Sequence, residues 1–399
     1  MDITIIPGKL SGTIAAISSK SHLHRVLICA ALADHDTEIY CSSVSNDIEA
    51  TISCLRALNS KIIRTETGYH VVPIQSPPQT AILNCGESGT TLRFMLPIVG
   101  ALGISGTFLL SGRLTERPLL PLWEQMEKHG CSIQKTANDT LLCSGQLHAG
   151  TFYFPGNISS QFISGVLLAM PLLNGSSKIN IEGILQSEPY VNMTLSVMEQ
   201  FGIKISDYEI PTAQPYISPG RYTIEGDWSN SAFFIAANAI GNQIQVTGLL
   251  HDSVQGDKSI STIINYMYTG ASISVQNIPD LVPPLSIVAA AGTGARFTEI
   301  SRLRLKESDR IQSITHMLNS LGISTTVMDD SLCVHPGHFH GGIVNSHKDH
   351  RIAMAAAIAA TVSHNPVTIL NAECVDKSYP TFWSDFTKLG GKYEQYIRP

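Results

Sequence analysis

The chain has 399 residues, a formal net charge of -6 at neutral pH and a pI of about 6.1. Hydrophobic residues make up 43% of it and charged residues 15%, against ~25% charged in ordinary soluble domains. This composition excludes a mainly disordered chain and argues against a general nucleic-acid binder, which must neutralise many phosphates. Any anionic ligand must therefore meet a local cluster of cations. At about 100–200 residues per domain, the length predicts two or three domains.

Cysteine usage and apolar runs predict the compartment. The eight cysteines are scattered without a C-x-x-C pair, which is typical of free thiols in a reducing cytoplasm. The first residues lack the basic and apolar regions of a secretion signal. The longest apolar run, 352–360, is far shorter than the ~18 residues that a membrane-spanning helix needs. We therefore expect a cytoplasmic protein without a membrane segment.

One pattern recurs six times along the chain: an amphipathic helix, a residue suited to end it, and a short alternating stretch. The predicted helices are 52–58, 122–129, 195–201, 263–269, 314–321 and 382–389, and the break residues are Asn59, Gly130, Gly202, Gly270, Gly322 and Gly390. Glycine supplies the left-handed position that ends a helix, and a period-2 run starts a strand. Because the spacing is too long for a solenoid, the pattern predicts six α/β units in a compact enzyme, three in each half.

A domain border is predicted near Gly226. Pro211, Pro215 and Pro219 interrupt the pattern there, and a new helix follows at about 232–240. Asp227 or one of the next polar residues is expected to cap that helix.

Polar helix starts in the first half are candidate anion sites. Ser18 to Arg25, Gly86 to Arg93 and Ser159 to Gln161 each precede or open an apolar helix, the last of them expected over 162–173. Arg113 and Arg117 precede a fourth helix. Free backbone amides at a helix start, with a cation beside them, bind anions. Ordinary capping explains each segment equally well when it is taken alone.

The second half carries a denser set of charges. At helical spacing, Lys306 and Arg310 share a face and repel unless an anion lies between them, and Glu307 lies beside the same cations. A salt-bridged surface helix is the simple alternative. Arg351 opens the apolar helix 352–360, where an unpaired guanidinium is costly, so we expect a carboxylate or phosphate partner for it. Lys377 precedes the last repeat helix in the same way.

A group of histidines invites a metal interpretation. His335, His338 and His340 lie in a turn that contains glycine and proline, and Cys333 is the only thiol close by. We therefore favour an exposed hairpin and expect no metal.

Taken together, these motifs resemble the enolpyruvyl transferase family, and within it the branch that makes 5-enolpyruvylshikimate 3-phosphate. The matching segments, in family order, are Ser19-Lys20-Ser21 with Arg25, Gly89-Thr90 with Arg93, Glu116-Arg117-Pro118, Ser159-Ser160-Gln161, Lys306 to Arg310 and Asp349-His350-Arg351. The resemblance covers nearly the whole chain. It implies an α/β fold, a two-domain inside-out α/β barrel in which each domain holds three βαβαββ units. We expect one domain to span 18–226 and the other 1–17 plus 227–399, with the first strand, 3–6, in the latter.

The resemblance also implies the reaction. The family transfers the enolpyruvyl group of phosphoenolpyruvate to the 5-hydroxyl of shikimate 3-phosphate and releases phosphate, a step toward chorismate and the aromatic amino acids. No metal and no organic cofactor is implied. We expect these two small molecules as the only partners, with no nucleic acid or membrane, and a monomer.

Site residues follow by position from the resemblance. Shikimate 3-phosphate would meet Lys20, Ser21, Arg25, Ser159, Ser160, Ser187, Asp280 and Lys306, with Tyr190 nearby; phosphoenolpyruvate would meet Lys20, Gly89, Arg117, Gln161, Arg310, Arg351 and Lys377. The catalytic residues would be Asp280 as proton acceptor, Glu307 as proton donor, and Lys20. Two phosphates, at about -1.5 to -2 each, and two carboxylates require such a cluster of cations. Glu87, Glu188 and Arg302 depart from the residues usual in the family.

Two other functions compete. The sibling branch that acts on UDP-N-acetylglucosamine carries a cysteine before its Arg-Pro, whereas 111–116 has none here. An inactive phosphometabolite-binding protein would have no reason to keep Asp280, Glu307 and Lys20 together. Because both halves carry cations that the substrates require, we also expect substrate to draw the two domains together.

Overall fold

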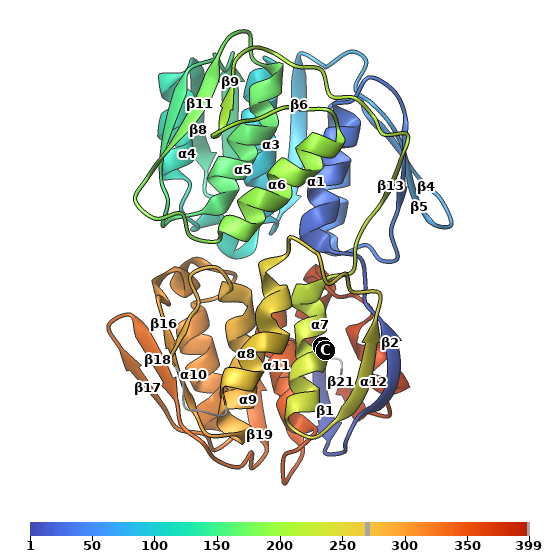
Figure 1. The fold of residues 1–399 in the computed structure, drawn as a ribbon, viewed down its shortest axis with the longest axis vertical. Helices are drawn as coiled ribbons and strands as arrows, with labels where there is room; N and C mark the ends of the chain where they lie inside the picture. The colour runs from blue at the N-terminus through green and yellow to red at the C-terminus, as the bar shows by residue number, and fades with distance from the viewer. Residues whose placement is uncertain (268–271, 397–399) are drawn as a thin grey trace. The chain divides into compact units, whose positions relative to one another are not determined.

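The computed structural model describes residues 1–267 and 272–396 (Figure 1). The chain forms two compact units, Ser18–Ile224 and Met1–Ile17 with Glu225–Pro399. That these units are separate domains, with borders after residues 17 and 226, stays a prediction.

The unit Ser18–Ile224 combines six longer helices with three sheets in its described residues. Its helices are α1 (Lys20–Ala31), α2 (Asn46–Ala57), α3 (Gly89–Ala101), α4 (Leu120–Lys128), α5 (Ser160–Ala169) and α6 (Glu188–Gln200), with short 3-10 helices η1 (Gly112–Thr115) and η2 (Met170–Leu172). Its strands are β3 (Thr37–Tyr40), β4 (Lys61–Arg64), β5 (Gly68–Val72), β6 (Thr80–Gly86), β7 (Ser105–Leu110), β8 (Cys131–Ala137), β9 (Thr140–Gly145), β10 (Thr151–Pro155), β11 (Ser177–Glu182), β12 (Glu209–Ile210) and β13 (Arg221–Thr223). The sheet orders are β13-β3-β5-β4, β6-β7-β9-β8 and β10-β11-β12.

The other unit has a similar inventory over the part of it that the structure describes. Its helices are α7 (Trp228–Ala239), α8 (Ile260–Met267), α9 (Val282–Ala291), α10 (Arg310–Ser320), α11 (His350–Ala360) and α12 (Phe382–Lys388), with η3 (Gly256–Ser259), η4 (Pro279–Leu281), η5 (Ser301–Leu305) and η6 (Ala372–Lys377). Its strands are β1 (Asp2–Ile6), β2 (Ser11–Ala15), β14 (Gln243–Thr247), β15 (Ser272–Ser274), β16 (Ala295–Thr298), β17 (Thr325–Met328), β18 (Ser331–Val334), β19 (Gly342–Asn345), β20 (Val367–Leu370) and β21 (Lys392–Tyr396). The sheet orders are β15-β16-β18-β17, β19-β20-β1-β21 and β14-β2.

The predicted βαβαββ unit is visible in both parts. In β6–β9, the first two strands are parallel and the last two pair antiparallel, and β15–β18 repeat this order. Elsewhere a distant strand completes the sheet. The N-terminal strand β1 lies between β20 and β21, with Ile3 opposite Ile369 and Gln395, which confirms that strand 3–6 joins the C-terminal unit.

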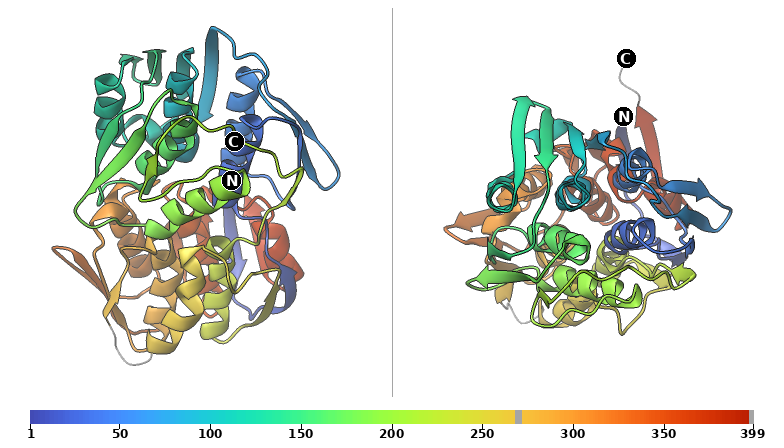
Figure 2. Two further views of the ribbon diagram at one scale, coloured as in Figure 1. Left: turned by 45° about the horizontal axis from the view of Figure 1, so that its top comes forward. Right: turned by 90° about the horizontal axis from the view of Figure 1, so that it is seen from above.

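Sheets lie at the outside of each unit, and its most buried helices lie at its centre (Figure 2). These helices are α1, α3 and α5 in one unit and α7, α9 and α11 in the other. In one unit α3 packs against α5, and in the other α7, α9 and α11 pack against one another. Every residue of α11 is buried, which is the expected position for a helix that is apolar on all sides. This arrangement leaves the N-terminal ends of central helices available to carry polar side chains.

The predicted helix ends are confirmed wherever the structure describes them. Asn59, Gly130, Gly202, Gly322 and Gly390 all have positive φ, between 73° and 99°. Gly270 lies outside the described residues.

Three local predictions are wrong. The alternating stretch that follows Gly202, residues 203–205, is expected to start a strand and does not. The amide of Gln214 bonds both the N–H and the C=O of Lys204, at 2.8 and 2.9 Å, in place of a neighbouring strand. The helix expected over 162–173 ends at Ala169 and continues as η2, which contains Pro171. The histidines 335–340 lie in a loop between β18 and β19, which belong to different sheets, and not in a hairpin.

Of the helices in the described residues, none has both the length and the apolar character needed to cross a bilayer.

Candidate active site

Three polar helix starts in the unit Ser18–Ile224 are built alike. Each of α1, α3 and α5 begins directly after a serine whose hydroxyl accepts a hydrogen bond from a backbone N–H two or three residues ahead. The capping residues are Ser19, Ser88 and Ser159, at 3.4, 3.3 and 3.3 Å. Lys20, Gly89 and Ser160 are thus the first residues of their helices, where exposed amides and the helix dipole favour anions.

Lys20 has a carboxylate partner that the sequence analysis missed. Its Nζ lies 2.8 Å from Oδ2 of Asp47, the second residue of α2. The Lys20 side chain is 16% exposed and that of Asp47 is 7% exposed, so the ammonium is held in place and still reaches the surface. An acidic residue in the first turn of the next helix was the available signal.

The motifs around Gly89, Arg117 and Gln161 converge. Arg93 Nη1 donates to Gln161 Oε1 at 2.8 Å, and Gln161 Nε2 donates to Thr90 Oγ1 at 2.9 Å. A Cβ atom on Gly89 would lie 2.6 Å from Arg93 Nη1 and 2.7 Å from Arg117 Nη1. Two guanidinium groups therefore meet at the backbone of Gly89, at a helix start that can admit an anion only because this residue has no side chain.

Arg25 connects α1 to α6. It is 2% exposed; Nε donates to Thr194 Oγ1 at 2.7 Å, Nη1 to the carbonyl of Ser21 at 2.7 Å, and Nη2 to the carbonyl of Tyr190 at 2.9 Å. Burial lowers the pKa of Arg25 to about 10. Ser187, at φ 56°, precedes α6 and is also buried. Arg25 thus fixes the backbone at Ser21 and Tyr190.

Asp280 is the centre of the charges in the other unit. Its Oδ1 lies 3.3 Å from Lys306 Nζ and 2.5 Å from Arg310 Nη1, and its Oδ2 lies 3.3 Å from Arg351 Nη2. Burial opposes its ionisation, but the three cations hold the pKa of Asp280 well below its usual range. The carboxylate of Asp280 therefore bonds both Lys306 and Arg310 and offsets their repulsion.

One guanidinium connects three carboxylates. Arg310, 1% exposed, also bonds Glu307 Oε2 at 2.7 Å and Asp349 Oδ2 at 2.8 Å. Burial opposes its charge, yet Asp349, Glu307 and Asp280 raise the pKa of Arg310 above its usual value. Asp349 is fully buried and caps α11 by accepting from the N–H of Arg351 at 3.0 Å. The sequence analysis gave it no role, although it lies in a recognised motif.

The expected helical spacing of Lys306 and Arg310 is wrong. Lys306 ends η5 in an extended conformation, and α10 starts at Arg310, capped by Asp309. The two cations reach Asp280 from a loop and a helix start. Burial lowers the pKa of Lys306 to about 8.

The remaining two cations are also held in the fold. Arg351, 5% exposed, donates from Nη2 to Ser229 Oγ at 2.8 Å as well as to Asp280, which confirms the predicted carboxylate partner. Lys377, the last residue of η6, is 8% exposed.

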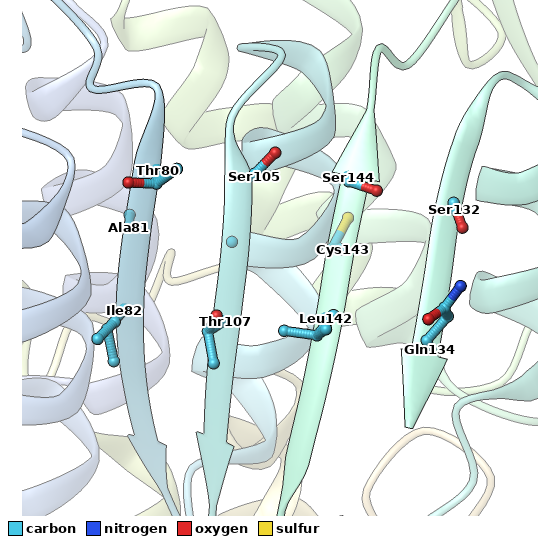
Figure 3. Close-up of a pocket in the computed structure, with 11 residues that line it drawn as sticks. Thr80, Ala81, Ile82, Ser105, Thr107, Ser132, Gln134, Leu142, Cys143 and Ser144 are labelled. Atoms are coloured by element: carbon cyan, nitrogen blue, oxygen red, sulfur yellow. The ribbon is translucent and has the colours of Figure 1, made fainter. Parts of the chain in front are cut away.

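A separate hollow of about 620 Å³ lies on the exposed face of the sheet β6-β7-β9-β8 (Figure 3). Short uncharged side chains such as Thr80, Ser105, Ser132 and Ser144 line it, and none of the predicted site residues does. Among the residues that the structure describes, no group of three or more histidines, cysteines and carboxylates is suited to hold a metal ion.

Comparison with known proteins identifies the family. The family model described as EPSP synthase (3-phosphoshikimate 1-carboxyvinyltransferase) matches residues 5–386. The chain belongs to this family. It is 38% identical to the 3-phosphoshikimate 1-carboxyvinyltransferase of Clostridium beijerinckii over 99% of both chains, and 37% identical to that of Clostridium botulinum strain Alaska E43 over 98% of both. The solved EPSP synthase of Acinetobacter baumannii superposes with a TM-score of 0.80 at 23% identity, covering 99% of this chain and 100% of that one.

Membership of the EPSP synthase family confirms the expected fold class and function. The structural match supports the two-domain inside-out α/β fold. The family consists of transferases of the shikimate pathway, whose substrates are shikimate 3-phosphate and phosphoenolpyruvate. The alternative branch that acts on UDP-N-acetylglucosamine is not favoured.

Proposed function

We propose that this chain transfers the enolpyruvyl group of phosphoenolpyruvate to the 5-hydroxyl of shikimate 3-phosphate. The polar helix starts of the unit Ser18–Ile224 and the charged groups around Asp280 carry out the reaction. The cluster at Asp280 is the observation that carries the proposal. A carboxylate held by three cations, with Glu307 on one of the same guanidinium groups, supplies two acids or bases and the positive charge that the substrates need.

The substrates are bound by groups from both units. We assign shikimate 3-phosphate to Lys20, Ser21, Arg25, Ser159, Ser160, Ser187, Asp280 and Lys306, and phosphoenolpyruvate to Lys20, Gly89, Arg117, Gln161, Arg310, Arg351 and Lys377. Helix starts at Lys20, Gly89 and Ser160 offer amides to phosphate or hydroxyl oxygens. Arg25 acts by fixing Ser21 as well as by its charge, since its donors bond protein groups.

The reaction requires two proton movements. The 5-hydroxyl oxygen attacks C2 of phosphoenolpyruvate while its proton leaves, and a proton adds to the C3 methylene. Loss of phosphate from C2 and of a proton from C3 then gives the enol ether. We assign the hydroxyl proton to Asp280 and the proton at C3 to Glu307, which matches the use of two carboxylates in different environments. Lys20 completes the catalytic set as a cation beside the reacting groups.

Substrate charge prepares both carboxylates. In the free protein, cations hold Asp280 as a weak base and Arg310 bonds Glu307 as an anion. Substrate phosphates and carboxylates compete for the same cations and add negative charge, so the proton affinity of both groups rises on binding.

The chain acts, we propose, as a cytoplasmic monomer; eight free cysteines are in keeping with a reducing compartment.

Phosphate release tests the function. Purified protein should release phosphate from phosphoenolpyruvate only when shikimate 3-phosphate is present, with and without a metal chelator. The control replaces shikimate 3-phosphate with UDP-N-acetylglucosamine and should give no release. Release with the nucleotide sugar, or none with shikimate 3-phosphate, would overturn the assignment.

A further inference from the structure

We propose that Asp257 is a positioning residue for Arg351, acting through the hydroxyl of Ser229. The inference rests on the proposed function, in which Arg351 binds phosphoenolpyruvate. Nothing in the motif pattern of the sequence pointed to either Asp257 or Ser229 as part of the site.

The hydrogen bonds form a relay that runs from Arg351 through the Ser229 hydroxyl to Asp257. Ser229, the second residue of α7, donates its hydroxyl hydrogen to Asp257 Oδ2, and its oxygen accepts from Arg351 Nη2 at 2.8 Å. A hydroxyl has one hydrogen to give. Because Asp257 takes that hydrogen, only lone pairs face the guanidinium, and Arg351 has a fixed acceptor that a freely rotating hydroxyl would not provide.

All three side chains of this relay are buried, or nearly so, which strengthens their interactions. Asp257 is 3% exposed, Arg351 5% and Ser229 9%. Burial, followed by Asp280 and Asp227, raises the pKa of Asp257 to about 6, while Arg351 and the Ser229 hydroxyl favour its charged form. Hydrogen bonds in a low-dielectric interior are strengthened, so the relay fixes the guanidinium more firmly than an exposed contact could.

The relay is useful during the proposed reaction. Arg351 Nη2 donates to Asp280 Oδ2 at 3.3 Å and to Ser229 Oγ at 2.8 Å, and its Nη1 donates to the backbone carbonyls of Ser229 and Asp280 at 3.4 Å. When Asp280 accepts the hydroxyl proton, its hold on Arg351 weakens. Asp257 and Ser229 then keep the guanidinium in position against phosphoenolpyruvate.

The loop that leads into η3, the short helix that carries Asp257, has an independent attachment. Gln255 accepts from the N–H of Trp228 at 3.0 Å and donates to the carbonyl of Gly226 at 2.8 Å. Loss of the Asp257 charge should therefore leave the loop docked on the start of α7. This makes conservative variants informative about function.

The test compares four variants with the wild type: Ser229→Ala, Asp257→Asn, the double variant, and Asp252→Asn as control. Asp252 is an exposed residue in the loop before η3 and undergoes the same chemical change. We expect Ser229→Ala to raise KM for phosphoenolpyruvate about tenfold, as for a lost hydrogen bond to a charged group. Asp257→Asn should raise it less, because an amide oxygen can still accept. KM for shikimate 3-phosphate should stay within about twofold.

The double variant separates a relay from two unrelated contacts. If Asp257 acts through Ser229, adding Asp257→Asn to Ser229→Ala should cause no further rise in KM. Three results would overturn the inference in a preparation whose wild type is active. The first is a double variant whose rise in KM is the product of the two single rises; the second is an equal rise in KM for both substrates. The third is a wild-type KM in both single variants. A wild-type protein without turnover on the two substrates would overturn the proposed function and this inference with it.

Discussion

At the scale of single residues, the charge around Asp280 decides what chemistry is available. A carboxylate bonded by Lys306, Arg310 and Arg351 has a low pKa and is a poor base. It becomes a better one when an anionic substrate takes a share of those cations. The same binding event favours a proton on Glu307. Substrate charge thus couples binding to catalysis, so neither carboxylate should be active before both substrates are present.

Removing either carboxylate tests this. Glu307→Gln and Asp280→Asn keep the shape of the side chain and lose its acid–base function. Each should lower kcat at least ~100-fold, within the range typical of general acid–base catalysis. Steady-state rates at saturating substrate measure the effect, and Glu299→Gln, at a half-buried residue, is a control for the loss of one charge in the same unit. Near-native turnover in one variant would reject the role of that residue.

Lys306 predicts a pH dependence. Burial lowers its pKa to about 8, so the ammonium is charged below that pH and neutral above it. Attraction for the substrate phosphate is therefore present at lower pH and lost as the pH rises through about 8. The ratio kcat/KM for shikimate 3-phosphate, which reports on the free enzyme, should fall over that range. Lys306→Arg keeps its charge and should lose this fall; an unchanged profile in the variant would contradict the assignment.

At the scale of elements, local pattern predicted helix ends and the polar starts of α1, α3 and α5 well, and contacts between distant elements poorly. Several other helices begin earlier than predicted, such as α7, which begins at Trp228 where the sequence predicted about 232. Gly322 and Gly390 end helices because the backbone there needs positive φ, which neighbouring residues alone determine. Ser19, Ser88 and Ser159 cap helices for similarly local reasons. The relay from Asp257 to Arg351 depends on how distant elements pack, and no sequence spacing encodes that. For the partnership of Lys20 with Asp47, the sequence offers only an acidic residue in the first turn of the next helix.

The geometry of Lys306 and Arg310 shows the limit of periodicity. Their spacing fits one helix face, but Asp309 caps a new helix between them, so the helix begins at Arg310. The family resemblance still placed both residues in the site, because a motif records which residues occur together and needs no correct helix assignment.

The close approach of two arginines to Gly89, at the start of α3, predicts that adding a methyl group to this residue weakens substrate binding. Gly89→Ala would place a Cβ 2.6 Å from Arg93 Nη1 and 2.7 Å from Arg117 Nη1. Since these are the ends of flexible side chains, they should move at little cost in stability while the anion site is distorted. KM for phosphoenolpyruvate should rise about tenfold, as for a lost charge-assisted hydrogen bond. Gly8→Ala, with no atom within 4 Å of the new Cβ, is the matched control; equal KM values in both variants would contradict this account.

At the scale of the whole molecule, a chain of net charge -6 concentrates cations where two phosphorylated substrates are proposed to bind. Each unit carries part of the set: Lys20 and Arg117 in one, Lys306, Arg310 and Arg351 in the other. Substrates that need both sets of cations should draw the units together, because the bound anions neutralise the positive charge that each unit carries. This closure stays a prediction.

Small-angle scattering measures closure directly. The radius of gyration should fall when shikimate 3-phosphate and phosphoenolpyruvate are added to the Glu307→Gln variant, which should bind but turn over slowly. Phosphoenolpyruvate alone is the comparison. A radius that is the same in all conditions, in a protein whose wild type is active, would contradict closure.

The transfer chemistry itself is tested most directly by running the wild-type reaction in D₂O and recording the mass and NMR spectrum of the product. Protonation of C3 by Glu307, which exchanges its proton with solvent, creates a methyl group that carries deuterium before phosphate leaves. The account therefore predicts deuterium in the vinyl methylene of 5-enolpyruvylshikimate 3-phosphate, formed in step with phosphate release. Product formed at the normal rate with no deuterium at that carbon would contradict addition and elimination through Glu307 and Asp280.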